Sequence, residues 1–385
     1  MTRSDYTWLT LRAGLRDLVL QEHLRTYNFF NGFLYPEEQC PQMITMIGER
    51  TKTLIMRKLR FGPRAPDGIA GEVHLRVDID GLRVESPRIF ADCELHNSSS
   101  LIKVGIEQSD GDTTRRPLTW HRGISHALDQ ATLSQIIYSK LIAPFSTVIC
   151  FFAADLGGLP AVAELLALWL IGFSNRPSDL PLSTFPRILI LTEWDRPEIF
   201  DEEKATNDFI LALGREAEKK HGVLTSSSGK LKMAEIKSIL LAQFGKLRVI
   251  SYPSLNSSYR SWKSLRSRIL LDSDELQSRR KEACVAFSSN HFKAFFSLAC
   301  DHFCSNIVSP FNFIQASRIV YPVPTELSFY IGQFLKKVAP VQYLNFAVPI
   351  IASALVFDSY PVGMHGRFAH ILILPILMCT RFSAL

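Results

Sequence analysis

The stretch PQMITMIGERTKTLIMRKLRFG, Pro41 to Gly62, decides the expected fold. An apolar run from Met43 to Ile47 ends at Gly48, and a run of this length and composition is typical of a buried strand. Lys52 and Thr53 follow, and the remaining residues are typical of a helix. The stretch therefore predicts a strand, a short turn and a helix, with a lysine and a hydroxyl group near the start of the helix.

This order matches a P-loop, which reads G-x-x-x-x-G-K-[ST] between a strand and a helix and surrounds phosphates with backbone N–H groups. Aligned on the Lys-Thr pair, the two glycine positions of the motif fall on Met46 and Thr51. Glycine permits positive φ and a close approach to phosphate, whereas the β-branched Thr51 tolerates positive φ poorly. Gly48 and the cationic Arg50 compensate in part. We therefore expect a phosphate loop with degenerate glycine positions.

Further strand candidates alternate with helical stretches along the next two hundred residues. The expected strands are Gly71 to Ile79, Pro87 to Leu95, Phe145 to Ala154, Phe185 to Asp195 and Lys246 to Tyr252. The expected helices are Leu159 to Phe173 and Glu202 to Lys220. Apolar strands that alternate with helices predict an α/β domain, in which a mostly parallel sheet is covered by helices on both faces to give three layers.

Two acidic residues stand at the ends of predicted strands, where parallel sheets bind their ligands. Asp92 closes the strand in RIFADCEL, and Asp195 lies just beyond the strand in ILILTEWD. Together with Lys52 and Thr53, they follow the order of the phosphate loop, the D-x-x-G segment and the [NT]-K-x-D segment of GTP-binding folds. The pattern favours a P-loop, GTPase-like domain. The alternative is an α/β domain whose strand-end acids only make turns.

The expected cofactors are GTP and Mg²⁺. Lys52 would neutralise the β and γ phosphates, Thr53 would place its hydroxyl on Mg²⁺, and Asp92 would hold the ion through water. Gly48 and Arg50 complete the expected phosphate-binding set.

Asp195 would read the guanine edge, with Thr192 at the Asn/Thr position of its motif. His96 stands where GTPases orient the attacking water, so it is the candidate catalytic residue. The favoured interpretation is a loop histidine ahead of the polar run NSSS. Two departures weaken the site. Leu95 replaces the glycine of the second motif, and Glu193 reverses the charge of the lysine in the third. We expect weak GTP binding and inefficient turnover.

The motifs also resemble a group of fungal P-loop proteins. PQMITMIGERTKT, GEVHLRVD and PRIFADCELH are similar to its "FVG…GKST" loop, its "GDVHLYAD" strand and its "ILFADCEG" strand, and the resemblance extends over most of the chain from Pro41 onward. In many of these proteins the block precedes another domain, often a patatin-like phospholipase. The resemblance thus implies a missing downstream domain. The apolar helical fragments from Phe287 to Leu385 predict packing on the α/β domain or on a protein partner.

A chain of 385 residues is long for one core and suggests two domains with an additional arm. Apolar residues recur at helical spacing in residues 1 to 40, which predicts an N-terminal helical arm. Residues 41 to 285 form the predicted GTPase-like domain. Residues 286 to 385, rich in phenylalanine and interrupted by prolines, predict an all-helical C-terminal domain.

Charge and cysteine usage restrict the partners and the compartment. The net charge of +6 is mild, and the basic cluster in Ser258 to Ala283 predicts a solvated helix face rather than a nucleic-acid surface. Seven scattered cysteines favour buried thiols and a reducing, cytoplasmic location. Cys300, His302 and Cys304 have a spacing that suggests zinc, but a fourth ligand is not apparent, so core thiols are expected. The apolar stretches are too short or too interrupted to span a membrane.

Three functions follow from these observations. The leading hypothesis is a degenerate GTPase-like module that acts as a regulatory or scaffolding unit. The alternatives are an active Mg²⁺-dependent GTP hydrolase, since Lys52, Thr53, Asp92 and Asp195 are all present, and an interaction domain that binds no nucleotide.

Overall fold

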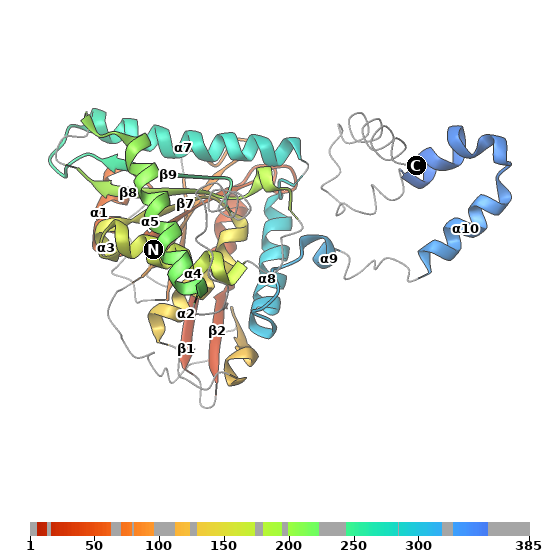
Figure 1. The fold of residues 1–385 in the computed structure, drawn as a ribbon, viewed down its shortest axis with the longest axis horizontal. Coiled ribbons are helices and arrows are strands. Elements are labelled where there is room, and N and C mark those ends of the chain that lie inside the picture. The colour runs from red at the N-terminus through yellow and green to blue at the C-terminus, as the bar shows by residue number, and fades with distance from the viewer. Residues whose placement is uncertain are drawn as a thin grey trace. The chain divides into compact units, whose positions relative to one another are not determined.

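The computed structural model describes eleven stretches of the chain (Figure 1). They are residues 6–13, 17–62, 71–78, 81–95, 112–123, 129–173, 180–194, 199–222, 244–283, 285–317 and 326–352. The chain divides into two compact units, one made of Met1–Arg279 with Phe287–Phe311 and the other of Arg280–Ala286 with Asn312–Leu385.

The first unit is built on a nine-stranded mixed sheet with the order β6-β2-β1-β4-β5-β3-β7-β8-β9. The strands are β1 (Thr7–Ala13), β2 (Leu18–His23), β3 (Gln42–Gly48), β4 (Val73–Val77), β5 (Arg88–Glu94), β6 (Thr113–Pro117), β7 (Ser146–Phe152), β8 (Arg187–Glu193) and β9 (Lys246–Tyr252). Neighbouring strands from β5 to β9 are parallel. The pairs on the β4, β1, β2 and β6 side are antiparallel. The predicted α/β class is therefore confirmed, with a parallel half and an antiparallel half.

Helices cover both faces of the sheet because its parallel strands are apolar on both sides. The described α-helices of this unit are α1 (Arg50–Lys58), α2 (Gln130–Ile137), α3 (Ala153–Leu156), α4 (Leu159–Phe173), α5 (Glu202–Gly222), α7 (Tyr259–Glu282, which ends in the second unit) and α8 (Ser289–Ser305). Shorter helical turns are η2 (Leu24–Gly32), η4 (Thr119–Gly123), η5 (Tyr138–Ile142), η6 (Ala143–Phe145) and η7 (Leu182–Thr184). On one face, Met46 and Phe152 share a buried cluster with Ile55 of α1 and Trp262 of α7. On the other, α4 lies beside α5 (Figure 1).

The predicted strands and helices of the parallel half are present. The run KLRVISY forms β9 from Lys246 to Tyr252, and the predicted helix from Leu159 to Phe173 is α4. Helix α1 begins at Arg50, four residues before the predicted helical run, so Lys52 lies in its first turn. Strands that are buried on both faces have continuous apolar runs in their sequence, so these strands could be predicted from the sequence.

The predicted N-terminal helical arm is wrong. Residues 7–13 and 18–23 form an antiparallel pair of strands, with Leu11 opposite Leu20, and β2 also pairs with β6. Trp8, Leu9 and Leu11 are all buried. Apolar residues therefore do not alternate along β1, and a run without alternation cannot be told from a buried helix by its periodicity.

Helix α8 belongs to the first unit, although its residues were predicted as part of the C-terminal domain. The ring of Trp8 in β1 lies 4.0 Å from that of Phe296 in α8, measured between centroids. Cys300 and Cys304 are buried in the same helix, and His302 Nε2 lies 3.0 Å from the carbonyl oxygen of Ser309. These cysteines are core thiols, as expected. In the described parts of the chain, no group of three or more His, Cys, Asp or Glu residues could hold a metal ion.

The second unit is helical in its described residues, as predicted for this region. It contains α9 (Phe313–Ser317), α10 (Leu327–Lys337), η9 (Pro340–Gln342) and η10 (Tyr343–Ala347). Across both units, the described helices are all too short or too polar to cross a bilayer.

The contact of Trp8 with α8 gives a test of the N-terminal strands. We expect Trp8→Ala to lower the free energy of unfolding by about 3 to 5 kcal/mol, because it empties a fully buried indole site. Urea denaturation of the full chain measures this value. The control is Trp194→Ala, which removes an indole that is 48% exposed and should cost less than about 1 kcal/mol. Equal effects of the two substitutions would contradict the placement of β1 in the core.

Candidate functional site

The candidate site begins where β3 ends and α1 starts. β3 lies between β5 and β7, so the carboxyl end of each of these parallel strands reaches the same edge of the sheet. Gly48 is the last residue of β3. A Cβ atom at this position would lie 2.7 Å from Asp155 Oδ2 and 3.1 Å from the Cβ atoms of Lys52 and Phe152. Glycine is needed at this position because side chains of the protein fill the space beside it.

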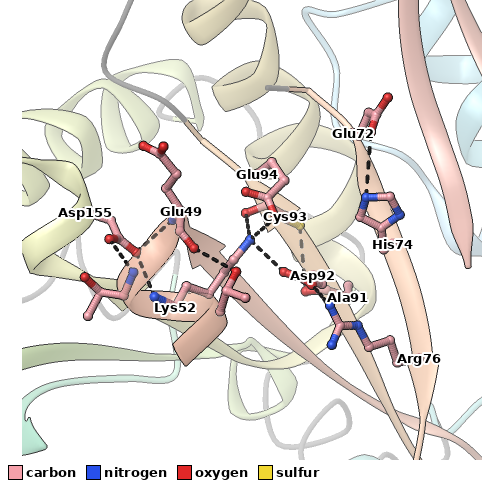
Figure 2. A network of polar contacts seen from close by, with 12 residues as sticks. Glu49, Lys52, Glu72, His74, Arg76, Ala91, Asp92, Cys93, Glu94 and Asp155 are labelled. Atoms are coloured by element: carbon pink, nitrogen blue, oxygen red, sulfur yellow. Dashed lines mark hydrogen bonds and ion pairs between the residues drawn. The ribbon is translucent and has the colours of Figure 1, made fainter. Parts of the chain in front are cut away.

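Lys52 points into the protein, and its side chain has no exposed surface (Figure 2). Its Nζ lies 2.6 Å from Asp92 Oδ1 and 2.9 Å from Glu94 Oε1, and it donates a 3.0 Å hydrogen bond to the carbonyl oxygen of Cys93. Burial alone would lower the pKa of Lys52, but the Asp92 and Glu94 carboxylates outweigh it, so the pKa is raised. Lys52 is therefore a charged lysine held by the end of β5.

Asp92 is shared between two cations. The guanidinium of Arg76, on the neighbouring strand β4, forms an ion pair with Asp92 Oδ2, while Lys52 contacts Oδ1. Burial would raise the pKa of Asp92, but Lys52 and Arg76 hold it below its ordinary value. Two cations thus face the carboxylates of Asp92 and Glu94, and the buried cluster is balanced in charge.

His74 lies directly across from Asp92 in the antiparallel pair of β4 and β5. It is fully buried, with Nδ1 3.3 Å from Thr7 Oγ1 and Nε2 3.7 Å from Glu72 Oε2. Burial lowers the pKa of His74 to about 4, although the nearby carboxylates oppose this shift. His74 is therefore neutral at physiological pH and leaves the charge balance of the cluster unchanged.

The start of α1 is occupied by a second carboxylate, that of Asp155 (Figure 2). Asp155 lies in α3, immediately after β7, and its Oδ2 accepts hydrogen bonds from the backbone N–H groups of Glu49 at 2.7 Å and Lys52 at 2.8 Å. Its Oδ1 accepts from the N–H of Thr51 at 2.8 Å. Free N–H groups at a helix start are the groups that bind anions, and here they bind an aspartate of the same chain.

The other residues predicted to contact phosphate or Mg²⁺ are directed elsewhere. Thr53 Oγ1 donates to the carbonyl oxygen of Glu49 at 2.9 Å, within its own helix. The side chain of Arg50 is 92% exposed and lies 3.7 Å from the carboxylate of Glu49. The N–H of Leu95, at the glycine position of the second motif, donates to the carbonyl oxygen of Gly48 at 3.0 Å.

The predicted base-reading segment lies at the end of β8, where Thr192 is half-buried and Glu193 is exposed. Burial, and then the charges of Glu193 and Asp155, raise the pKa of Tyr252 to about 12. Both acids therefore act on the same end of β9. His96 and Asp195 lie outside the described residues, so their predicted roles stay predictions.

The site thus brings together Lys52 and Asp92 as predicted, but not the rest of the expected set. Among the described residues, Lys52, Thr53 and Asp92 are bound by other protein groups, so as arranged they do not fit the phosphates and Mg²⁺ of a nucleotide. No protein-family model matches the sequence, and no curated protein matches it either.

Three important residues were not among the predicted site residues: Arg76, Glu94 and Asp155. Asp155 closes a predicted strand in the same way as Asp92, so the rule that selected Asp92 applies to it as well. Arg76 shares one face of β4 with His74, which the alternation in GEVHLRVD indicates.

The buried pairs of Lys52 predict a large effect on stability. We expect Lys52→Met to lower the free energy of unfolding by about 3 to 5 kcal/mol, because the buried carboxylates of Asp92 and Glu94 lose their shared cation. Urea denaturation measures the loss. Lys58→Met is the matched control, because Lys58 is exposed near the other end of α1, and it should cost less than about 0.5 kcal/mol. If Lys52→Met were equally mild, the ammonium group would not be paired in the interior.

The lowered pKa of His74 predicts a pH dependence of stability. Between pH 6.5 and about 4, the unfolded chain protonates His74 and the folded protein does not, so the free energy of unfolding falls as pH falls. This component amounts to about 3 kcal/mol across the window. We expect His74→Gln to lose less stability than the parent between these pH values, as measured by urea titrations at several pH values. Parallel curves for the two proteins would show that His74 titrates normally.

Proposed function

We propose that this chain is a degenerate GTPase-like P-loop module that acts as a regulatory or scaffolding unit and does not turn over GTP. The place of the loop in the sheet supports the GTPase-like part of the proposal. In the strand order β4-β5-β3-β7-β8-β9, the loop follows the inner parallel strand β3, and Lys52 lies in the first turn of the next helix, which is the strand–loop–helix order of a P-loop. Parallel sheets bind their ligands at this carboxyl edge.

The observation that carries the loss of turnover is the burial of Lys52 between Asp92 and Glu94. A P-loop lysine stabilises phosphoryl transfer by contacting the β and γ phosphates. Lys52 would have to leave two carboxylates to do so, and those carboxylates would remain in the interior without their cation. Leaving a buried charge unpaired costs several kcal/mol, which opposes phosphate binding.

Metal binding is opposed by the same contacts. Asp92, the expected Mg²⁺ ligand, already pairs with Lys52 and Arg76. The hydroxyl of Thr53 is directed to the carbonyl oxygen of Glu49. The acids Asp155 and Glu193 add negative charge at the carboxyl edge of the sheet, where a triphosphate would add more. Weak affinity and negligible hydrolysis follow from this arrangement.

A module of this kind would act through its surface. It would present a fixed α/β domain to a protein partner or to a further domain, as the resemblance to multidomain fungal P-loop proteins implies. Five described cysteines are free, and four of them are buried, which suits the reducing conditions of the cytoplasm.

Nucleotide titration tests the proposal. We expect the full chain to show no GTP binding tighter than about 1 mM by calorimetry in the presence of Mg²⁺, and no phosphate release. Thermal melting should be unchanged by GTP·Mg²⁺ or ATP·Mg²⁺, whereas a native-state site occupied at 100 times its Kd would add roughly 2.7 kcal/mol. Micromolar GTP binding, or phosphate release that Asp92→Asn abolishes, would instead identify an active GTPase.

A further inference from the structure

The backbone N–H groups of the loop between β3 and α1 would be expected to donate hydrogen bonds to a bound anion. In this protein they donate to the side chain of Asp155. We propose that the Asp155 carboxylate is an internal ligand, which replaces a phosphate group and keeps the loop folded in the absence of nucleotide. This inference rests on the proposed GTPase-like module and concerns how its phosphate loop is occupied. It makes Asp155 the residue that blocks the anion-binding N–H groups of the loop.

The geometry of Asp155 is that of a bound anion. Both of its oxygens are used, and together they accept from the backbone N–H groups of Glu49, Thr51 and Lys52 at 2.7 to 2.8 Å. These distances are typical of charge-assisted hydrogen bonds. The positive end of the α1 dipole adds to the attraction.

Ordinary helix caps in this protein differ from this contact. Asp129 caps α2 by accepting one backbone N–H, that of Thr132 at 2.7 Å, and Asp201 accepts that of Lys204 at 2.9 Å. Each of these caps lies three residues from its donor. Asp155 lies more than a hundred residues along the chain from its donors, in the helix that follows the neighbouring strand β7. It accepts hydrogen bonds from three backbone N–H groups. Its contact therefore depends on tertiary structure, as a ligand contact does.

Gly48 fits the same explanation. A Cβ at this position would lie 2.7 Å from Asp155 Oδ2, so the glycine leaves space for the carboxylate rather than for an added ligand. A phosphate site of this type also contains a lysine. Here that lysine, Lys52, forms ion pairs with Asp92 and Glu94 of the same chain. Both the N–H groups and the ammonium of the loop are thus satisfied by the protein.

Removal of the internal ligand should create an anion site. We expect Asp155→Ala to lower the Tm by on the order of 5 to 10 °C, because three N–H groups lose their acceptor. Inorganic phosphate at about 50 mM should then raise the Tm of this variant by about 3 to 5 °C more than it raises that of the parent. Chloride at matched ionic strength is the reference, since phosphate stabilises many proteins weakly without a site.

Asp129→Ala is the matched control, because it also removes a helix-capping aspartate but leaves only one N–H without its acceptor. It should gain no more from phosphate than the parent does. A phosphate response of Asp155→Ala equal to that of the parent or of Asp129→Ala would overturn the proposal. Should Asp155→Ala fail to fold in chloride, Asp155→Asn is tested in the same way. Folding of either variant in phosphate alone supports the proposal, and failure of both in either salt overturns it.

The same titrations separate this inference from the proposed function. Tight binding of GTP·Mg²⁺ to the parent would contradict the proposed loss of turnover, whatever phosphate does to the variant. An absence of phosphate rescue, with no nucleotide binding to the parent, would contradict only the role of Asp155 as an internal ligand.

Discussion

An ammonium group without access to water must have carboxylates beside it, and the arrangement around Lys52 follows from this constraint. The end of β5 supplies Asp92 and Glu94, so α1 and β5 are held together at the centre of the sheet. Asp92 in turn requires a second cation, which Arg76 on β4 supplies. Helix α1, strand β5 and strand β4 thus each contribute to a balanced set of charges. His74 completes the set by remaining neutral.

The carboxyl edge of the parallel strands is where α/β proteins bind their ligands, and this chain uses that edge for contacts with itself. Asp155, Glu94 and Asp92 are all anions at positions where anionic ligands would otherwise meet lysine and helix N–H groups. A site of this construction can keep its shape without a bound molecule. Such a fold can serve binding or assembly without catalysis, because function resides in the site and not in the architecture.

The sequence indicated a large part of this arrangement, for identifiable reasons. Runs such as ILIL and VICFF are strands buried on both faces, and the strand-end rule placed Lys52 and Asp92 near the same edge, where they are in contact. The direction of Lys52 was not predictable in this way. Whether it faces solvent or the interior depends on Glu94, more than forty residues away in the chain. Strand β1 was mistaken for helix because both of its faces are covered, and β6 was missed because TTRRP is short and polar.

The pairing of β1 with elements far along the chain has a consequence for protein synthesis. Strands β1 and β2 are synthesised before their partner helix, because Phe296, which packs on Trp8, follows almost three hundred residues later. At a translation rate of roughly 5 to 20 residues per second, helix α8 is synthesised on the order of 15 to 60 seconds after Trp8. During that interval the nascent chain exposes an apolar hairpin with open edges, which is the kind of segment that chaperones bind and that associates with other chains when they do not. A slower rate of translation therefore lengthens the interval in which this hairpin lacks its partner helix.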